Sequence, residues 1–103
     1  MNIGALTEGV YYILLSLLEP RHGYGIMQYV SELSSDRVNL AAGTLYGALS
    51  SMVEKNWIEA LPDDTDSRKK EYVITPLGRQ ILEEELHRLD ELLTNGRRLF
   101  KEV

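Results

Sequence analysis

The chain has no cysteine among its 103 residues, and this excludes a disulfide framework, a thiolate metal site and a cysteine nucleophile. Long hydrophobic runs are also missing, since the longest early apolar stretch, Val10 to Leu18, is interrupted by Ser16 and has no basic leader before it. A membrane-spanning helix needs about 20 apolar residues, and a secretory signal needs a basic start. We therefore expect one small domain that is cytoplasmic and has no membrane partner.

The sequence also lacks an excess of basic residues. Its 11 Lys and Arg against 16 Asp and Glu give a formal net charge of −5, whereas nucleic-acid binding normally leaves a basic footprint. The charges are segregated, however, because the acids gather at 63–66 and 83–85 while 38–53 carries no charge at all. A basic triplet follows the first acidic cluster: Arg68, Lys69 and Lys70. The net charge therefore leaves DNA binding open.

Apolar residues at i, i+3, i+4 spacing predict three helices in the first half of the chain. The first runs from about Leu6 to Leu18 and stops before Pro20, because proline disfavours helical geometry in the residue before it. The second is short and covers Ile26 to Leu33. The third runs from about Ala42 to Lys55.

The third helix has two unlike faces. Its apolar face carries Leu45, Leu49, Met52 and Val53. The opposite face carries only small, neutral residues: Gly43, Thr44, Gly47, Ser50 and Ser51. Exposed helix faces usually carry charged side chains, so this face suits the close approach of a large flat or grooved partner. A helix packed on both sides is the alternative.

The second half of the chain begins with a predicted β-hairpin. Residues 57–61 and 70–75 alternate and are rich in aromatic and β-branched residues, and turn formers fill 62–67 between them. An extended segment from Val38 to Leu40 could add a third strand. Pro76 then opens a final helix with Thr75 as its N-cap.

The final helix carries a heptad seam, with apolar residues at alternating four- and three-residue spacing. The seam consists of Leu82, Leu86, Leu89, Leu93, Gly96, Phe100 and Val103. At 1.5 Å per residue the helix would reach about 40 Å, which overhangs a domain of this size, so we expect the seam to bind another chain. Two alternatives stay open: the helix ends at Asn95-Gly96, or it lies on its own domain.

The predicted fold is mainly α with a small β-hairpin, in the order helix, helix, helix, hairpin, helix. A winged helix-turn-helix with a long C-terminal dimerisation helix fits this order. We expect residues 1–75 to form the DNA-binding domain, including the N-terminal helix, and residues 76–103 to form the dimerisation helix, within one continuous compact domain.

Residues 23–82 resemble the PadR family of winged-helix regulators. The match rests on a combination of short elements: His22-Gly23-Tyr24-Gly25-Ile26, Gly43-Thr44-Leu45-Tyr46, Ala48-Leu49, Trp57-Ile58, Arg68-Lys69-Lys70-Glu71-Tyr72, Thr75, Gly78-Arg79 and Leu82. The short tail is similar to the compact branch of the family. Two departures are Gly47, where many relatives have proline, and Ala41-Ala42, where many have Ser-Pro. The second removes an obvious N-cap and leaves Asn39 as the nearest candidate.

The resemblance implies a homodimeric repressor whose third helices enter successive major grooves of operator DNA while the wings follow the phosphate backbone. Groove docking puts the start of a recognition helix against base edges, which makes Gly43, Thr44, Tyr46 and Ser50 the candidates. Tyr46 could instead pack against the hairpin with its hydroxyl at the rim. The candidate phosphate ligands are Arg68, Lys69 and Lys70.

The remaining expectations concern the dimer and an effector. The seam residues we expect at the dimer interface are Leu86, Leu89, Leu93 and Phe100. Members of the compact branch often bind flat aromatic compounds between subunits. The aromatic residues that could line such a pocket in this chain are Tyr11, Tyr12 and Phe100. Ordinary interface packing is the alternative role for these three.

Other classes of function fit the sequence less well. An enzyme is not expected, because there is no cysteine nucleophile and because His22 and His87 are far apart, one in a turn and one on a mostly acidic helix. Glu84 and His87 supply too few ligands for a metal, and pairing of Glu84 with Arg88 is the simpler account, so we expect neither metal nor cofactor. The main alternative is a winged-helix protein-interaction module that does not bind DNA.

Overall fold

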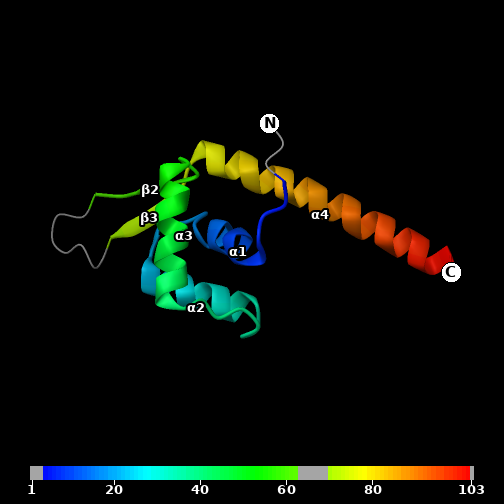
Figure 1. Cartoon of the computed structure of the whole chain (residues 1–103), viewed down its shortest axis with the longest axis horizontal. Coiled ribbons are helices and arrows are strands. Elements are labelled where there is room, and N and C mark those ends of the chain that lie inside the picture. Colours follow the sequence, from blue (N-terminus) through cyan, green and yellow to red (C-terminus); the bar gives the residue numbers. More distant parts are fainter. Residues whose placement is uncertain (1–3, 63–69, 103) are drawn as a thin grey trace.

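The computed structural model describes residues 4–62 and 70–102, and it is mainly helical with one small antiparallel sheet (Figure 1). This confirms the predicted fold class. The elements follow in the order α1 Glu8–Ser16, β1 Arg21–His22, α2 Gly23–Leu33, α3 Ala42–Glu54, β2 Ile58–Ala60, β3 Glu71–Ile74 and α4 Pro76–Glu102. In the described ranges, no helix is long and apolar enough to cross a membrane.

Side chains cap three of the four described helices. The Thr7 hydroxyl accepts the Val10 N–H at 3.2 Å, and the His22 Nδ1 accepts the Gly25 N–H at 3.2 Å. The Thr75 hydroxyl accepts the Gly78 N–H at 3.0 Å, which confirms Thr75 as the N-cap of the last helix. Each of these bonds satisfies a backbone donor that the first turn of a helix leaves without a partner.

The prediction of Asn39 as the N-cap of the third helix is wrong. Ala41 occupies the cap of α3, which has no side-chain cap hydrogen bond. The Asn39 amide donates to the Asp36 carbonyl at 2.8 Å, and its oxygen accepts the Ser31 hydroxyl at 3.0 Å. Asn39 therefore stabilises the turn before α3, because it lies too early in the chain to reach the helix.

The sheet has the strand order β1-β3-β2, with both pairs antiparallel. Ala60 and Arg21 both lie opposite Tyr72, on either side of β3. The prediction that 38–40 supplies the third strand is wrong, since β1 occupies that edge. The Val38 N–H is bonded to the Ser34 hydroxyl at 2.9 Å, and this ties the segment to the turn after α2.

The hydrophobic core gathers one face of every helix against the sheet, and α1 lies between α2 and α4 (Figure 1). Its most buried apolar members are Ile13, Leu14, Leu17, Ile26, Val30, Leu45, Leu49 and Ile58. α4 starts so close to the sheet that a Cβ at Gly78 would overlap the Trp57 carbonyl oxygen. Glycine is therefore required where α4 crosses the end of β2.

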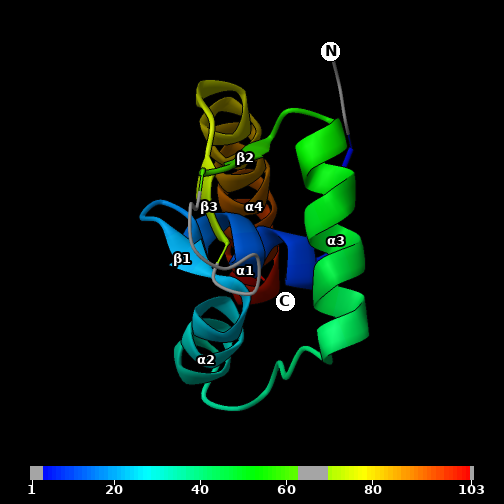
Figure 2. The same cartoon turned by 90° about the vertical axis from the view of Figure 1, so that its left-hand side faces the viewer.

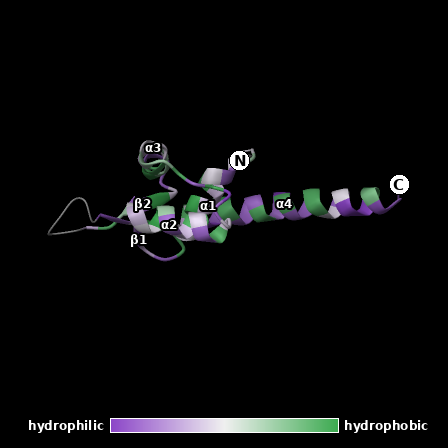
Figure 3. Cartoon of the chain, turned by 90° about the horizontal axis from the view of Figure 1, so that it is seen from below, coloured by the Kyte–Doolittle hydropathy of each residue, from purple (hydrophilic) through white to green (hydrophobic). Residues whose placement is uncertain are grey.

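α4 leaves the domain after its first turns and continues as one unbroken helix to Glu102 (Figure 1). The alternative in which the helix ends at Asn95-Gly96 is wrong. The molecule measures 59 × 32 × 20 Å along its principal axes, and α4 points along the longest one. Hydrophobic and hydrophilic residues alternate along the projecting part of the helix (Figure 3).

Candidate nucleic-acid interface

The turn between α2 and α3 joins the two helices of a helix-turn-helix. Ser35 and Asp36 both have positive φ, at 54° and 63°, a conformation in which short polar side chains are enriched because they bond locally. The Asp36 N–H donates to the Ser31 carbonyl at 2.7 Å, and the Ser31 hydroxyl donates to the Asp36 carboxylate at 2.6 Å. The turn thus has a hydrogen-bond network of its own.

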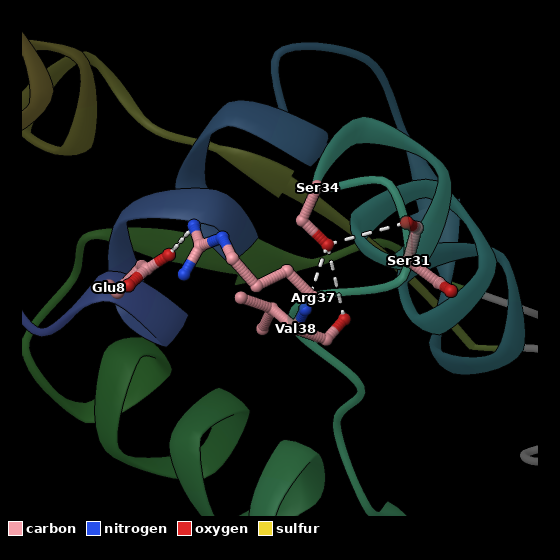
Figure 4. A network of polar contacts seen from close by, with 5 residues as sticks. All are labelled: Glu8, Ser31, Ser34, Arg37 and Val38. Carbon is pink, nitrogen blue, oxygen red and sulfur yellow. Dashed lines mark hydrogen bonds and ion pairs between the residues drawn. The ribbon is translucent and has the colours of Figure 1, made fainter.

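Arg37 links this turn to the N-terminal helix. Its guanidinium donates to the Glu8 carboxylate at the start of α1 (Figure 4). The pKa of Glu8 is lowered by that hydrogen bond more than by the charge of Arg37, and the pKa of Arg37 is raised by the same bond. Sequence reasoning missed this pair, because 29 positions separate the two residues.

α3 lies at one side of the domain (Figure 2) and buries only its apolar face. Leu45, Leu49 and Met52 are buried. The opposite face is exposed and uncharged, and it carries Gly43, Thr44, Gly47, Ser50 and Ser51. A Cβ placed at Gly43 or Gly47 would meet nothing within 4 Å. Among residues 4–62 and 70–102, therefore, nothing packs on this second face, and the alternative of a helix packed on both sides does not apply there.

Tyr46 lies at the edge between the two faces of α3. Its side chain is 46% exposed, while the end of its ring lies against the backbone of Gly23, where a Cβ would overlap the hydroxyl oxygen. The pKa of Tyr72 on β3 is raised chiefly by burial and to a smaller extent by the nearby Tyr46. Tyr46 therefore packs where α2 begins, beside the sheet, with part of its ring open to solvent.

The described part of the wing consists of β2 and β3, which pair antiparallel. Lys70 is exposed immediately before β3. Arg68 and Lys69, the other two predicted phosphate ligands, lie outside the described residues.

The projecting part of α4 carries an uncovered apolar surface. Leu86 is 46% exposed, Leu93 is 52% exposed and Phe100 is 87% exposed, while Leu89 is half-buried. Sequence reasoning missed Leu92 and Leu99, which are also exposed, because a heptad template marks a narrower stripe than a straight helix presents. A shallow hollow of about 900 Å³ is lined by Leu89, Leu92, Leu93, Gly96, Arg97, Arg98, Phe100 and Lys101.

A second cavity, of about 310 Å³, lies between α1 and α4. It is lined by Leu6, Glu8, Tyr11, Tyr12, Glu85, Arg88 and Leu89. Tyr11 and Tyr12 pack with their ring centroids 5.8 Å apart. The structure thus brings these two predicted effector residues together in one cavity and places Phe100 in the other.

The wall of this second cavity contains a buried carboxylate. Glu85 is only 5% exposed, and it accepts two hydrogen bonds of 2.7 Å from Arg88 and one of 3.3 Å from the Leu6 N–H. These bonds, led by Arg88, lower the pKa of Glu85. The prediction that Glu84 pairs with Arg88 is wrong, because Arg88 donates to Glu85 instead. Glu85 lies on the side of α4 that faces α1 and the residues before it. In the described ranges, no three acidic or histidine side chains gather as a metal site.

Helices α2 and α3 with their turn, followed by the β2–β3 wing, define a winged helix-turn-helix protein. The family model described as the transcriptional regulator PadR-like family matches residues 12–84. The chain belongs to this family, whose members are transcriptional regulators and not enzymes, and it carries the family's DNA-binding fold.

Solved structures with the same fold include PadR-family regulators. One from Eggerthella lenta is 24% identical with a TM-score of 0.72, over 88% of this chain and 80% of that one. A second, from Clostridium difficile, is 24% identical with a TM-score of 0.68, over 88% and 97%. BpsR from Bordetella bronchiseptica, whose DNA binding is regulated by 6-hydroxynicotinic acid, is 16% identical with a TM-score of 0.72, over 92% and 67%.

The chain also matches an uncharacterised 37.1 kDa protein of transposon TN4556 from Streptomyces fradiae. The two are 36% identical over 73 residues, which is 71% of this chain and 20% of that protein. The chain thus spans about a fifth of the length of this relative.

Proposed function

We propose that the protein is a homodimeric, sequence-specific DNA-binding repressor. The exposed, uncharged face of α3 carries this proposal, because small side chains allow the helix to enter a major groove closely. Thr44 and Ser50 would bond base edges or phosphates, and Gly43 would admit a phosphate to the backbone. Tyr46 would reach DNA only at its exposed edge, since its ring is packed against Gly23.

The wing would contribute phosphate contacts. Lys70, exposed immediately before β3, supports this role, and Arg68 and Lys69 would extend it. Such contacts add affinity without reading sequence. The acids in 63–66 would repel phosphate, so we place the contact along the second strand.

The dimer would form through α4, with residues 1–75 as the DNA-binding part and 76–103 as the dimerisation helix. Uncovered leucines along the projecting helix support this arrangement, because contiguous exposed apolar side chains are typical of interfaces. The helix also carries acids at Asp90 and Glu91 and bases at Arg97, Arg98 and Lys101. An antiparallel pair of α4 helices would place these opposite charges near one another.

An aromatic effector would relieve repression by binding beside this interface. The cavity lined by Tyr11 and Tyr12 and the hollow that contains Phe100 both support such a site. BpsR offers a precedent in the same fold, since 6-hydroxynicotinic acid regulates its DNA binding.

A gel-shift titration on the DNA upstream of the protein's own gene tests this proposal. We expect a shift that weakens as salt is raised, since phosphate contacts release counterions. The absence of any shift at low salt would favour the alternative, a winged-helix protein-interaction module, which the net charge of −5 supports. A sedimentation experiment at micromolar concentration tests the dimer separately, and a monomer there would contradict it.

A further inference from the structure

The first turn of α3 has no side-chain cap, so besides the packing of Leu45 and Tyr46 its position depends on the turn before it. Ala41 contributes only its carbonyl, which accepts the Leu45 N–H at 2.9 Å. The preceding turn is held to the end of α2 by Ser34, whose hydroxyl accepts the Val38 N–H at 2.9 Å and lies 3.3 Å from the Ser31 carbonyl (Figure 4). All of these bonds are local to the turn.

Arg37 makes a polar contact that joins this turn to α1. Its side chain runs from the turn toward α1 and meets Glu8 there (Figure 4). The Tyr12 hydroxyl, one helical turn further along α1, also raises the pKa of Arg37. Glu8 and Tyr12 both line the cavity between α1 and α4. The Glu8–Arg37 ion pair therefore links this cavity to the turn that precedes α3.

We propose that Arg37 is a positioning residue for DNA recognition, which holds the start of α3 against α1 through Glu8 and does not itself bind phosphate. This rests on the proposed DNA binding. The competing explanation is that Arg37, a cation next to the recognition helix, contacts the DNA backbone directly. The two explanations predict opposite effects for the loss of Glu8.

Neutral variants of each partner separate the two explanations. We expect Glu8→Gln and Arg37→Gln each to weaken DNA binding by about two- to fivefold per subunit, the range of an exposed ion pair. The slope of log affinity against log salt concentration should stay unchanged in both variants, because no phosphate contact is lost. Glu84→Gln is the matched control, since it removes the same charge from an exposed position on α4.

A direct phosphate contact would instead leave Glu8→Gln as tight as Glu84→Gln or tighter, because the variant releases Arg37 toward DNA. That result, or a shallower salt slope for Arg37→Gln alone, would overturn the proposal. If neither the wild type nor any variant shifted DNA, the proposed DNA binding would fail, and this outcome is distinct from the others.

Amide hydrogen exchange tests the same link without DNA. We expect faster exchange at Val38 and Leu45 in Glu8→Gln than in Glu84→Gln, with far-UV circular dichroism unchanged. Equal exchange rates in the two variants would overturn the positioning role, whatever the DNA experiments show.

Discussion

At the scale of single residues, close contacts set the positions of the elements. Gly78 allows α4 to begin against the carbonyl of Trp57, and Gly23 allows the ring of Tyr46 to lie on the start of α2. Gly47 has open space around it. The glycines of this chain therefore differ in whether the fold has room for a side chain at their position.

Gly78→Ala should destabilise the protein by about 3 kcal/mol, because the new methyl group would overlap a backbone oxygen that cannot move alone. Gly47→Ala is the control and should stabilise α3 by about 0.5–1 kcal/mol, since alanine favours a helix more than glycine does. Urea unfolding followed by circular dichroism measures both free energies. Equal stabilities for the two variants would contradict the close contact at Gly78.

Glu85 should make stability depend on acidic pH. Its pKa is lowered from the ordinary value of 4.5, chiefly by Arg88, so the unfolded state binds more protons than the folded state between about pH 4.5 and the lower pKa of the folded state. The stabilisation is therefore complete above about pH 4.5 and is lost as pH falls through the folded-state pKa. Thermal unfolding from pH 6 to pH 3 should show a smaller decline in Glu85→Gln than in the wild type. Parallel declines would argue against this contribution.

Lys70→Ala should weaken binding to all DNA sequences alike, and Lys69→Ala should do the same, because phosphate contacts carry no sequence information. Fluorescence anisotropy with operator and random duplexes measures the two affinities. A loss of sequence preference without a loss of affinity would instead indicate base contacts from the wing.

At the scale of elements, α3 and α4 each bury one face and expose another, but the exposed faces differ in chemistry. The free face of α3 carries small, neutral side chains. The free face of α4 instead continues the largely apolar arc that packs first on the sheet and then on α1. Gly78, Ile81, Leu82 and Glu85 are buried on that arc. Further along, past the edge of the domain, its leucines are exposed.

Leu93→Asp should convert the proposed dimer to a monomer, because a charge in an apolar interface must lose its hydration. Thr94→Asp is the matched control, since it places the same charge on a neighbouring side of the exposed helix. Analytical ultracentrifugation at micromolar concentration compares the two. Dimers of equal stability would show that α4 does not form the interface through this face.

At the scale of the whole molecule, an acidic protein is proposed to bind an acidic polymer. The chain carries few cations near α3 and the wing, so each subunit would neutralise only a few phosphates and bind weakly alone. Two linked subunits bind far more tightly than one, because the second contact becomes intramolecular. On this proposal, dimerisation would be part of the DNA-binding mechanism.

Leu93→Asp should therefore lower the affinity for operator DNA by at least about 100-fold, the range expected when bivalent binding is lost, while Thr94→Asp retains it. Gel-shift titrations at low salt measure the change. Unaltered affinity of a monomeric variant would show that one subunit suffices.

The sequence by itself determined the features that depend on neighbours in the chain. Apolar spacing indicated all four helices, Thr75-Pro76 indicated where the last begins, and the uncharged run in 38–53 indicated the free face of α3. Such signals are local, because helix periodicity and capping involve residues within a few positions of each other.

Only the tertiary structure decided which distant segments meet. It placed Arg21–His22 rather than Val38–Leu40 beside β3, turned Glu85 rather than Glu84 toward α1, and paired Arg37 with Glu8. Each outcome depends on how the helices pack, and a strand of two residues or a single ion pair leaves no periodic pattern in the sequence. The winged helix-turn-helix was therefore readable from the sequence, whereas the contacts that hold α3 in place became visible only once the chain was folded.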